Sequence, residues 1–583
     1  MIKKLLSSIR EFKKDTILTP LLVMGEVILE VVIPYLMSNL IDFGIDVGDM
    51  GYILKMGVAL LLSSFISLAF GALAGRSAAI ASCGFARNLR HDLFYRVQGF
   101  SFANIDHFSS ASLVTRLTTD VSNVQMAFQM STRMAFRAPL MLLFSMLMAF
   151  RVNASLAMIF LYCVPVLGLG LWLIIKNAHP IFERVFKTYD KLNRVVQENL
   201  RGIRVVKSFV REEHENDKFQ TISESIYQDF SKAERIVSYN APLMQACVYA
   251  CMLLISWFGA RLIVQSGNNP AAGMSTGQLM SMMTYVMQIL MSLMMLSMIF
   301  VMLTISRASA ERVVEVLDEQ SDLHNPENPI MSVPDGAIDF NGVSFSYSKD
   351  PAKCCLSDID LHIASGQTVG ILGVTGSAKS SLVQLIPRLY DVTGGTLKVG
   401  GVDVKQYDVE TLRNAVAMVL QKNVLFSGSI KENLRWGNPD ATDEELVEAC
   451  RVAQADEFIQ TFPDGYDTHI EQGGSNVSGG QKQRLCIARA LLKKPKILIL
   501  DDSTSAVDTR TDALIRQGFS SSIPGTTKLI IAQRVASVQD ANLIVLLDNG
   551  RIIAKGTHDE LMQDSEIYRE IFESQRKGAE DDE

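Results

Sequence analysis

A short loop of small residues follows an apolar stretch and precedes a helical pattern in the second half of the chain. Its nine residues are, in order, Gly373, Val374, Thr375, Gly376, Ser377, Ala378, Lys379, Ser380 and Ser381. The loop nearly fits GxxxxGK[ST], the P-loop, in which backbone N–H groups and a helix N-terminus bind phosphate oxygens. We expect Lys379 to reach the β- and γ-phosphates of a nucleotide and Ser380 to bind Mg²⁺. Ala378 replaces the last glycine, and its methyl group crowds the loop or limits its dihedral angles, which predicts reduced affinity.

A buried-strand pattern that ends in two acidic residues lies further along the chain. Residues 497–502 read ILILDD, and a strand of this kind delivers a carboxylate to Mg²⁺, a role that we assign to Asp501. Taken alone, such a segment is more often an ordinary buried strand, but after a P-loop it indicates a nucleotide site. Between the two, a helical segment begins with Ser478, Gly479, Gly480 and Gln481. Its N-terminus is expected to be a second element that reads phosphate.

The half of the chain that carries these motifs has the composition of a soluble protein. Residues 307–335 form a charged, proline-containing linker, and strand and helix patterns then surround the P-loop over residues 336–573. This order predicts an α/β P-loop nucleotide-binding domain of the RecA-like class. The last ten residues, 574–583, form a charged tail that we expect to be disordered.

The preceding half, residues 1–306, is far more apolar. The 583-residue chain is 48% hydrophobic and 20% charged, and its mean hydropathy is +0.20. These values exclude a disordered chain, a collagen and a small disulfide scaffold. Six stretches have the length that a bilayer requires, about 20 apolar helical residues, and they predict an all-α membrane domain. They are residues 17–38, 56–76, 134–151, 154–176, 241–263 and 278–306, of which the third is the weakest.

Charges around the spans indicate their orientation. Basic residues crowd ahead of the first span, in the pattern of an amphipathic helix, and acidic residues occupy the loop after it. They are Lys3, Lys4, Arg10, Lys13 and Lys14 before the span, and Asp42, Asp46 and Asp49 after it. The positive-inside rule predicts a multi-pass cell-membrane protein whose N-terminus and soluble half are cytoplasmic. Connections 77–133 and 177–240 are expected to form helical hairpins that project about 40 Å beyond the bilayer.

Two features within the spans allow two interpretations each. Glu26 and Glu30 share one helix face, which favours either a contact to a cation or proton, or pairing with another helix or with headgroups. Nine methionines lie in the last span, and flexible thioether side chains suit an adaptable apolar surface. Either a subset lines a cavity, or the methionines only pack and face lipid. That subset comprises Met287, Met291, Met294 and Met298.

The order of these elements resembles the ATP-binding cassette (ABC) family, in the form of an exporter half-transporter with six helices ahead of its cassette. The sequence VSGGQ between a P-loop and the ILILDD strand is the most specific part of the likeness. The resemblance implies that Tyr347 stacks on adenine, that Gln421 touches Mg²⁺ and senses the membrane domain, and that Asp508 is the D-loop aspartate. It also implies two cassettes that bind two ATP molecules head to tail. Each ATP then lies between one chain's P-loop and the other chain's signature sequence, here residues 478–481.

The chain departs from the family pattern at two positions that matter for hydrolysis. Where the family has a glutamate base, this chain has Asp502, whose carboxylate retreats by about one ångström, a misplacement that can cost about 10²-fold. Where the family has a switch histidine, this chain has Gln533, whose amide can hydrogen-bond the γ-phosphate but cannot titrate or carry charge. Because the signature is intact, we expect a degenerate site in a heterodimer, with hydrolysis at the site that joins this signature to the partner's P-loop.

Three alternatives to that heterodimer stay open. One is a homodimeric exporter that hydrolyses ATP slowly, and another is an ATP-gated regulatory or channel-like subunit. The third is that Ala378, Asp502 or Gln533 was introduced to trap one state. The expected ligands are ATP and Mg²⁺, and the expected partners are a second half-transporter, the lipid bilayer and an amphipathic drug, lipid or peptide. A net charge of −7 without a basic stripe argues against nucleic acid.

Overall fold

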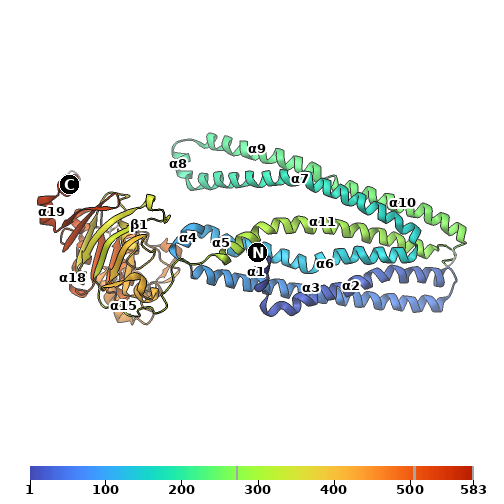
Figure 1. Cartoon of the computed structure of the whole chain (residues 1–583), viewed down its shortest axis with the longest axis horizontal. Coiled ribbons are helices and arrows are strands. Elements are labelled where there is room, and N and C mark those ends of the chain that lie inside the picture. The colour runs from blue at the N-terminus through green and yellow to red at the C-terminus, as the bar shows by residue number, and fades with distance from the viewer. Residues whose placement is uncertain (271–272, 503–506, 581–583) are drawn as a thin grey trace. The chain divides into compact units, whose positions relative to one another are not determined.

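The chain divides into two compact units in a computed structural model that describes residues 1–270, 273–502 and 507–580. The membrane unit comprises Met1–Gln98 and Ser110–Glu319, and the cassette unit comprises Gly99–Ser109 and Gln320–Glu583. The membrane unit consists of long helices, and the cassette unit combines strands with short helices (Figure 1). This composition confirms the predicted order of an all-α membrane domain followed by an α/β domain.

Six helical stretches of the described chain are long and apolar enough to cross a membrane. They are Arg10–Ile45, Met50–Gln98, Ser110–Val152, Ala154–Arg201, Glu212–Ser266 and Thr276–Asp318. Their main helices are α2 (Lys13–Leu40), α3 (Met50–Gln98), α6 (Val121–Val152), α7 (Ala154–Arg201), α10 (Asn240–Ser266) and α11 (Thr276–Asp318). All six predicted spans are confirmed, including the third, whose helix contains Arg133, Arg137 and Arg151.

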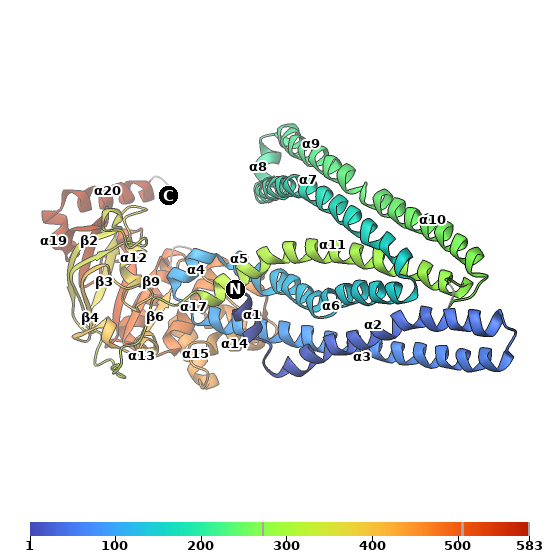
Figure 2. The same ribbon diagram turned by 45° about the vertical axis from the view of Figure 1, so that its right-hand side comes forward.

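Four further helices complete the membrane unit. They are α1 (Ile2–Ser7), α5 (Ser110–Thr115), α8 (Ile203–Ser208) and α9 (Glu212–Val237). Helix α9 runs back alongside α7, and α8 lies at the turn between them (Figures 1 and 2). Helix α11 continues to Asp318, so the first part of the predicted linker 307–335 is helical.

An ion pair inside the membrane unit settles how Glu26 and Glu30 are used. Arg137 of α6 pairs with Glu26 and, at 2.7 Å from Nη2 to Oε2, with Glu30, both of α2. Gly71 of α3 leaves room for the Glu26 carboxylate, since a Cβ atom there would lie 3.0 Å from Oε1. Pairing between helices is therefore the interpretation that the structure supports. Gln288 of α11 adds a third helix to this cluster, donating to the Glu30 carbonyl at 3.3 Å.

The cassette unit is built on two main sheets. A six-stranded sheet has the order β12-β11-β3-β10-β9-β6, with all neighbours parallel except β12 and β11, and an antiparallel sheet has the order β2-β1-β4-β5. The strands of the first sheet are β3 (Thr368–Leu372), β6 (Val416–Val419), β9 (Ile497–Asp501), β10 (Thr527–Ile531), β11 (Leu543–Asp548) and β12 (Arg551–Gly556). Those of the second are β1 (Ile338–Phe345), β2 (Leu356–Ile363), β4 (Gly394–Val399) and β5 (Val402–Asp403). Strand β9 is buried along its whole length, as its apolar run predicts.

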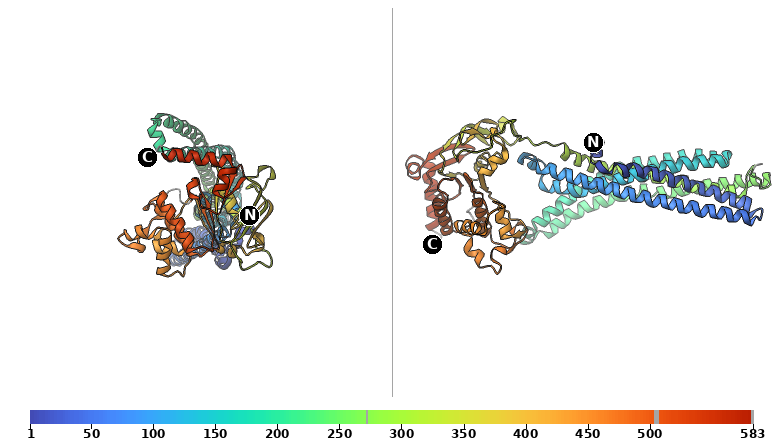
Figure 3. Two further views of the ribbon diagram at one scale, coloured as in Figure 1. Left: turned by 90° about the vertical axis from the view of Figure 1, so that its left-hand side faces the viewer. Right: turned by 90° about the horizontal axis from the view of Figure 1, so that it is seen from below.

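Helices flank these sheets and carry the motifs at their ends. The principal ones are α12 (Lys379–Gln384), α13 (Val409–Ala415), α14 (Ile430–Arg435), α15 (Asp443–Val452), α17 (Gly479–Leu492), α18 (Thr509–Ser522), α19 (His558–Asp564) and α20 (Glu566–Glu580). The C-terminal helices α19 and α20 lie at the periphery of the cassette in every view (Figure 3). Helix α20 extends to Glu580, so most of the tail expected to be disordered is helical.

Helix α4 (Phe102–Phe108) follows α3 in sequence but belongs to the cassette unit. The Tyr390 hydroxyl donates to Asp106 Oδ2 at 2.6 Å, and the Phe102 ring meets Tyr390 edge to face with centroids 6.1 Å apart. The Asn104 amide also donates to the Gln320 carbonyl at 3.1 Å. The turn of the first hairpin is therefore fixed to the cassette by polar and aromatic contacts.

Candidate nucleotide-binding site

The P-loop lies between β3 and α12, where the sequence predicts it. The loop needs unusual backbone at Gly373, where φ is +153° and a Cβ atom would come within 2.2 Å of the Leu547 carbonyl oxygen. The Lys379 ammonium reaches back across the loop and donates to the carbonyls of Gly373 and Val374, both at 2.8 Å. Burial lowers the pKa of Lys379, and the charges of Asp502 and Asp501 oppose that shift. The loop therefore presents a partly buried cation to an incoming phosphate.

Ala378 occupies a left-handed backbone conformation immediately before α12. Its φ is +69° and its ψ is +25°. Glycine adopts this region freely, whereas a residue with a Cβ atom loses roughly 1–2 kcal/mol there. Alanine in place of the last P-loop glycine therefore strains the backbone. This is the limit on dihedral angles that the sequence predicts beside crowding of the loop.

Ser380 and Asp501 meet at the carboxyl end of the parallel sheet. The Ser380 hydroxyl donates to Asp501 Oδ1 at 2.9 Å, and Asp501 is 4% exposed. Burial raises the pKa of Asp501, which means that a positive charge beside it would be favourable. Mg²⁺ commonly uses one or two protein ligands together with substrate phosphates, and this pair fits that chemistry. When bound, Mg²⁺ neutralises charge on the β- and γ-phosphates.

The described residues contain no group of three or more histidine, cysteine, aspartate or glutamate side chains that could hold a metal ion. Ser380 and Asp501 are the side chains that would hold Mg²⁺. Gln421 donates to Asp502 Oδ2, and its expected contact with Mg²⁺ stays a prediction.

Asp502 is held by two amide side chains. Gln533 Nε2 donates to Asp502 Oδ2 at 2.8 Å, and Gln421 Nε2 donates to the same oxygen at 3.3 Å. Asp502 has φ of +48°, a conformation that aspartate tolerates better than most residues. The three residues predicted to replace or assist the catalytic machinery are thus brought together at the ends of β9, β10 and β6. An amide that donates to this carboxylate competes with any water that the carboxylate would activate.

Gln575 of α20, which no sequence pattern indicated, fixes the backbone around Gln533. Its amide nitrogen donates to the Gln533 carbonyl at 2.8 Å, and its amide oxygen accepts from the Val535 N–H at 2.8 Å. The C-terminal helix therefore helps to hold the segment after β10. Glutamine in a charged amphipathic helix is ordinarily a surface residue, so this role becomes visible only in three dimensions.

Tyr347 follows β1 and stands beside the P-loop. Its side chain is 51% exposed, and its hydroxyl lies 2.9 Å from that of Ser381. Tyr390 meets its ring edge to face, with centroids 5.2 Å apart. An exposed ring next to the P-loop has the position that base stacking requires.

The signature residues form the N-terminus of α17. Ser478 caps the helix, accepting from the Gln481 N–H at 3.3 Å, while the Gln481 side chain accepts from the Ser478 N–H at 2.9 Å. Among the described residues, none of the hydrogen bonds joins residues 478–481 to the P-loop. Asp508 similarly caps α18, accepting from the Thr511 N–H at 2.9 Å, but the residues just before it, 503–506, lie outside the described chain.

Comparisons with protein families match both units. The model of the ABC transporter transmembrane region covers residues 16–306, and the ABC transporter cassette model covers residues 356–505. A relative from Bacillus subtilis, the uncharacterized ABC transporter ATP-binding protein YfiB, is 36% identical over 99% of this chain and 100% of its own length. The chain belongs to the ABC transporter family.

Further comparisons extend this assignment. A fatty acid ABC transporter ATP-binding/permease protein of Mycobacterium bovis is 32% identical, over 83% of this chain and 75% of its own length. A bacterial Atm1-family ABC exporter with ATP bound has the same fold, with a TM-score of 0.81 and 23% identity over 97% of this chain and 99% of that one. This ABC transporter is accordingly a multi-pass membrane protein with an exporter-type membrane unit and a cytoplasmic, ATP-binding cassette that drives transport by hydrolysis.

Proposed function

We propose that this ABC exporter chain is the degenerate-site subunit of a heterodimer that exports amphipathic substrates. On this proposal, its own P-loop holds ATP for long periods and cleaves it slowly. Its signature, residues 478–481, completes a second site on the partner's P-loop, where most hydrolysis occurs. ATP-driven transport would then depend mainly on hydrolysis at the partner's P-loop.

The observation that carries the proposal is the Asp502 carboxylate between two amides. A general base must accept a proton from water at hydrogen-bond distance. Asp502 is one methylene shorter than glutamate, and its Oδ2 atom already accepts from Gln533 and Gln421. A charged imidazole, which would stabilise negative charge at the γ-phosphate, is replaced by a neutral amide at position 533. Each feature favours retention of ATP over its cleavage.

Two exposed features of the chain favour a second half-transporter as its partner. Residues 478–481 cap their own helix and leave the signature's exposed N-terminus available to a phosphate group from outside. The tip of the second hairpin is also strongly apolar, with Phe209 73% exposed and Val210 80% exposed. Exposed apolar groups of this size at a cytoplasmic tip favour burial against another protein surface.

We propose that the tip binds in a groove on the partner chain's cassette. This chain's own cassette has a groove of the kind required. This groove has a volume of about 350 Å³, and the stacked rings of Phe426 and Trp436, whose centroids are 4.2 Å apart, form part of its lining. An aromatic groove of this kind suits an apolar helical turn. Reciprocal exchange of tips and grooves would bind the two half-transporters together.

The exposed methionines of α11 are the reason that we propose apolar or amphipathic substrates. Met287, Met291, Met294 and Met298 are 40–66% exposed on successive turns, whereas Met282 is fully buried. Flexible thioethers adapt to ligands of different shape. A relative named as a fatty acid transporter is consistent with substrates of this class.

The decisive experiment compares signature and base variants in the purified pair formed with a candidate partner half-transporter. Ser478→Ala should remove most of the steady-state ATPase activity, because it damages the hydrolytic composite site, whereas Asp502→Ala should leave most of it. Ser475→Ala is a matched control, since Ser475 lies just outside the signature and bonds to Glu471. A homodimer predicts instead that Ser478 and Asp502 variants lose activity alike, and an ATP-gated subunit predicts ATPase activity that no substrate stimulates.

A further inference from the structure

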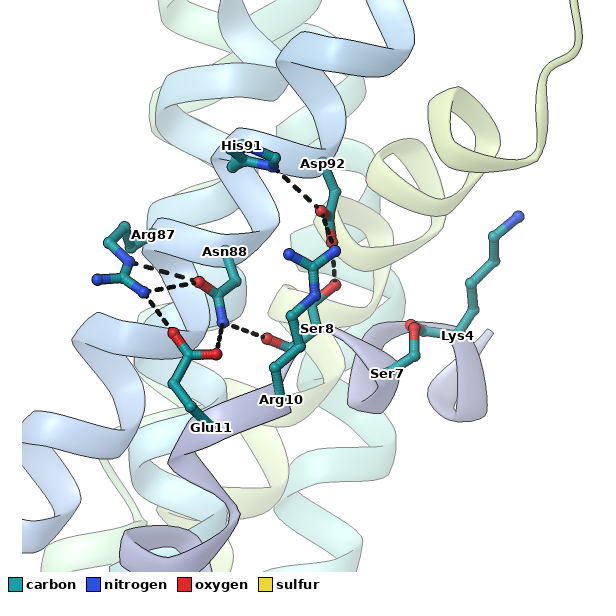
Figure 4. Close-up of polar contacts among 9 residues, drawn as sticks. All are labelled: Lys4, Ser7, Ser8, Arg10, Glu11, Arg87, Asn88, His91 and Asp92. Carbon is teal, nitrogen blue, oxygen red and sulfur yellow. Dashed lines mark hydrogen bonds and ion pairs between the residues drawn. The ribbon is translucent and has the colours of Figure 1, made fainter.

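The N-terminal segment, residues 2–14, is clamped on its inner side to the cytoplasmic ends of α3 and α11. Lys4 donates to the Leu317 carbonyl at 2.9 Å and pairs with Asp318. Ser8 donates to Asp92 at 2.8 Å, and Arg10 pairs with the same carboxylate at 2.5 Å. Figure 4 shows the contacts to α3, where Asn88 and Arg87 also reach Glu11. The basic residues of the inner side therefore already have acidic or carbonyl partners.

The outer side of the same segment is basic and apolar without such partners. Lys3, Lys13 and Lys14 are exposed, and none of the ion pairs of the described chain involves them. Ile2 is 66% exposed and Leu6, one turn later, is 46% exposed. Large apolar side chains beside unpaired lysines are typical of a surface that lies in the headgroup region of a membrane.

The position of this surface relative to the bilayer follows from α2. Ile17, Leu21, Met24 and Ile28 form one stripe along the helix, with 40–66% of each side chain exposed. Apolar residues at this spacing on a membrane-spanning helix face lipid. Lys13 continues the stripe by one turn at its cytoplasmic end. Lys13 and Lys14, in the first turn of α2, therefore lie where the acyl region of the inner leaflet gives way to its headgroups.

We propose that the outer side of the N-terminal segment is a binding site for anionic phospholipid headgroups of the cytoplasmic leaflet. Lys3, Lys13 and Lys14 attract the phosphate groups, and Ile2 and Leu6 enter the adjoining acyl boundary. The inner clamp holds the segment in this position through its bonds to α3 and α11. The segment that binds the headgroups is thus also bonded to the end of α11. In the sequence, the cassette unit follows directly after α11.

The test measures which lipids stay with the full-length chain. The chain is solubilised from vesicles of equimolar phosphatidylglycerol and phosphatidylcholine, and the retained lipids are quantified by mass spectrometry. We expect phosphatidylglycerol to be enriched over the vesicle ratio. The triple variant with Lys3→Gln, Lys13→Gln and Lys14→Gln should lose the enrichment, by up to roughly fivefold per lysine, since each lysine near an anionic surface contributes about 1 kcal/mol.

Two further variants keep the result interpretable. Changing the same three lysines to arginine should preserve the enrichment, because the charge is kept. Changing the exposed cassette lysines Lys353, Lys405 and Lys555 to glutamine removes equal charge away from the membrane unit and should also preserve it. Equal retention of both lipids by the unmodified chain would overturn the proposal. So would a glutamine variant that remains folded, by size-exclusion and thermal unfolding, and still enriches phosphatidylglycerol.

Discussion

At the scale of single residues, the central feature is the Asp502 carboxylate, one of whose oxygens already accepts two hydrogen bonds. Asp502 Oδ2 accepts from Gln533 and Gln421, while the neighbouring Asp501 keeps its bond to Ser380. Two adjacent acidic residues thus have different surroundings and different roles. On the proposed function, Asp501 is the Mg²⁺ ligand and Asp502 is a poor general base.

Restoring the missing groups should increase hydrolysis at this chain's own P-loop. Asp502→Glu combined with Gln533→His should raise the single-turnover rate by about 10²-fold or more, because the carboxylate then advances toward the water and the imidazole replaces the amide. The rate is measured as phosphate release in a pair whose partner lacks its own base. Asp502→Asn is the control for side-chain shape and should bring no gain. No increase in the double variant would show that another feature limits the site.

Relief of backbone strain at Ala378 should stabilise the cassette and tighten nucleotide binding. Ala378→Gly removes a left-handed cost of roughly 1–2 kcal/mol but adds freedom to the unfolded chain, so we expect a net gain of about 0.5–1 kcal/mol. A comparable gain at the phosphate site corresponds to roughly threefold tighter ATP binding. Thermal unfolding and nucleotide titration measure both effects. Ala513→Gly, in the middle of α18, should have the opposite sign, a loss of about 0.5–1 kcal/mol.

At the scale of secondary-structure elements, the helices of the membrane unit are joined by a charged cluster and the first hairpin is joined to the cassette by α4. The sequence marked Glu26 and Glu30 as unusual but did not indicate Arg137 as their partner. Their pairing depends on how α2 and α6 pack, which spacing along one helix cannot show. The partner of Tyr390 was invisible for the same reason, since Asp106 lies in a separate part of the sequence.

Removal of Arg137 should destabilise the membrane unit because it leaves two carboxylates in a largely apolar setting. Arg137→Met should cost about 3–5 kcal/mol, the range seen when one partner of a buried ion pair is lost. Thermal unfolding in detergent or nanodiscs measures the loss. The triple variant that adds Glu26→Gln and Glu30→Gln should recover most of it. A stable Arg137→Met protein would mean that water or lipid compensates the carboxylates.

Loss of the Tyr390 hydroxyl should weaken communication between α4 and the cassette while ATP binding persists. Tyr390→Phe removes a hydrogen bond to a charged acceptor, worth roughly 1.5–3 kcal/mol, but keeps the ring that packs on Tyr347. We expect unchanged ATP affinity together with reduced stimulation of ATPase activity by substrate. The comparison of these two readouts in the reconstituted pair checks the prediction. Asp106→Asn, which retains an acceptor, should have a smaller effect.

At the scale of the whole molecule, patterns within one segment could be read from the sequence and contacts between segments could not. The six spans, the P-loop, the strand that ends in Asp501 and the signature helix each follow from local spacing, and all lie where they were predicted. Other features depend on packing between distant residues. They are the length of α11, the helical C-terminal segment and the hydrogen bonds of Gln575 to the Gln533 carbonyl and the Val535 N–H. The hydrogen bonds from Gln421 and Gln533 to Asp502 also join distant segments. The sequence indicated both glutamines but not these bonds.

The most direct test of the heterodimer account measures ATP hydrolysis and transport by this chain reconstituted alone and together with a second half-transporter that has a glutamate base and a switch histidine. We predict that the chain alone binds Mg²⁺–ATP and retains it as intact ATP after washing, with little turnover and no transport. The pair should transport and hydrolyse ATP, and both activities should depend on Ser478. Rapid ATP turnover coupled to transport by the chain alone would contradict the account.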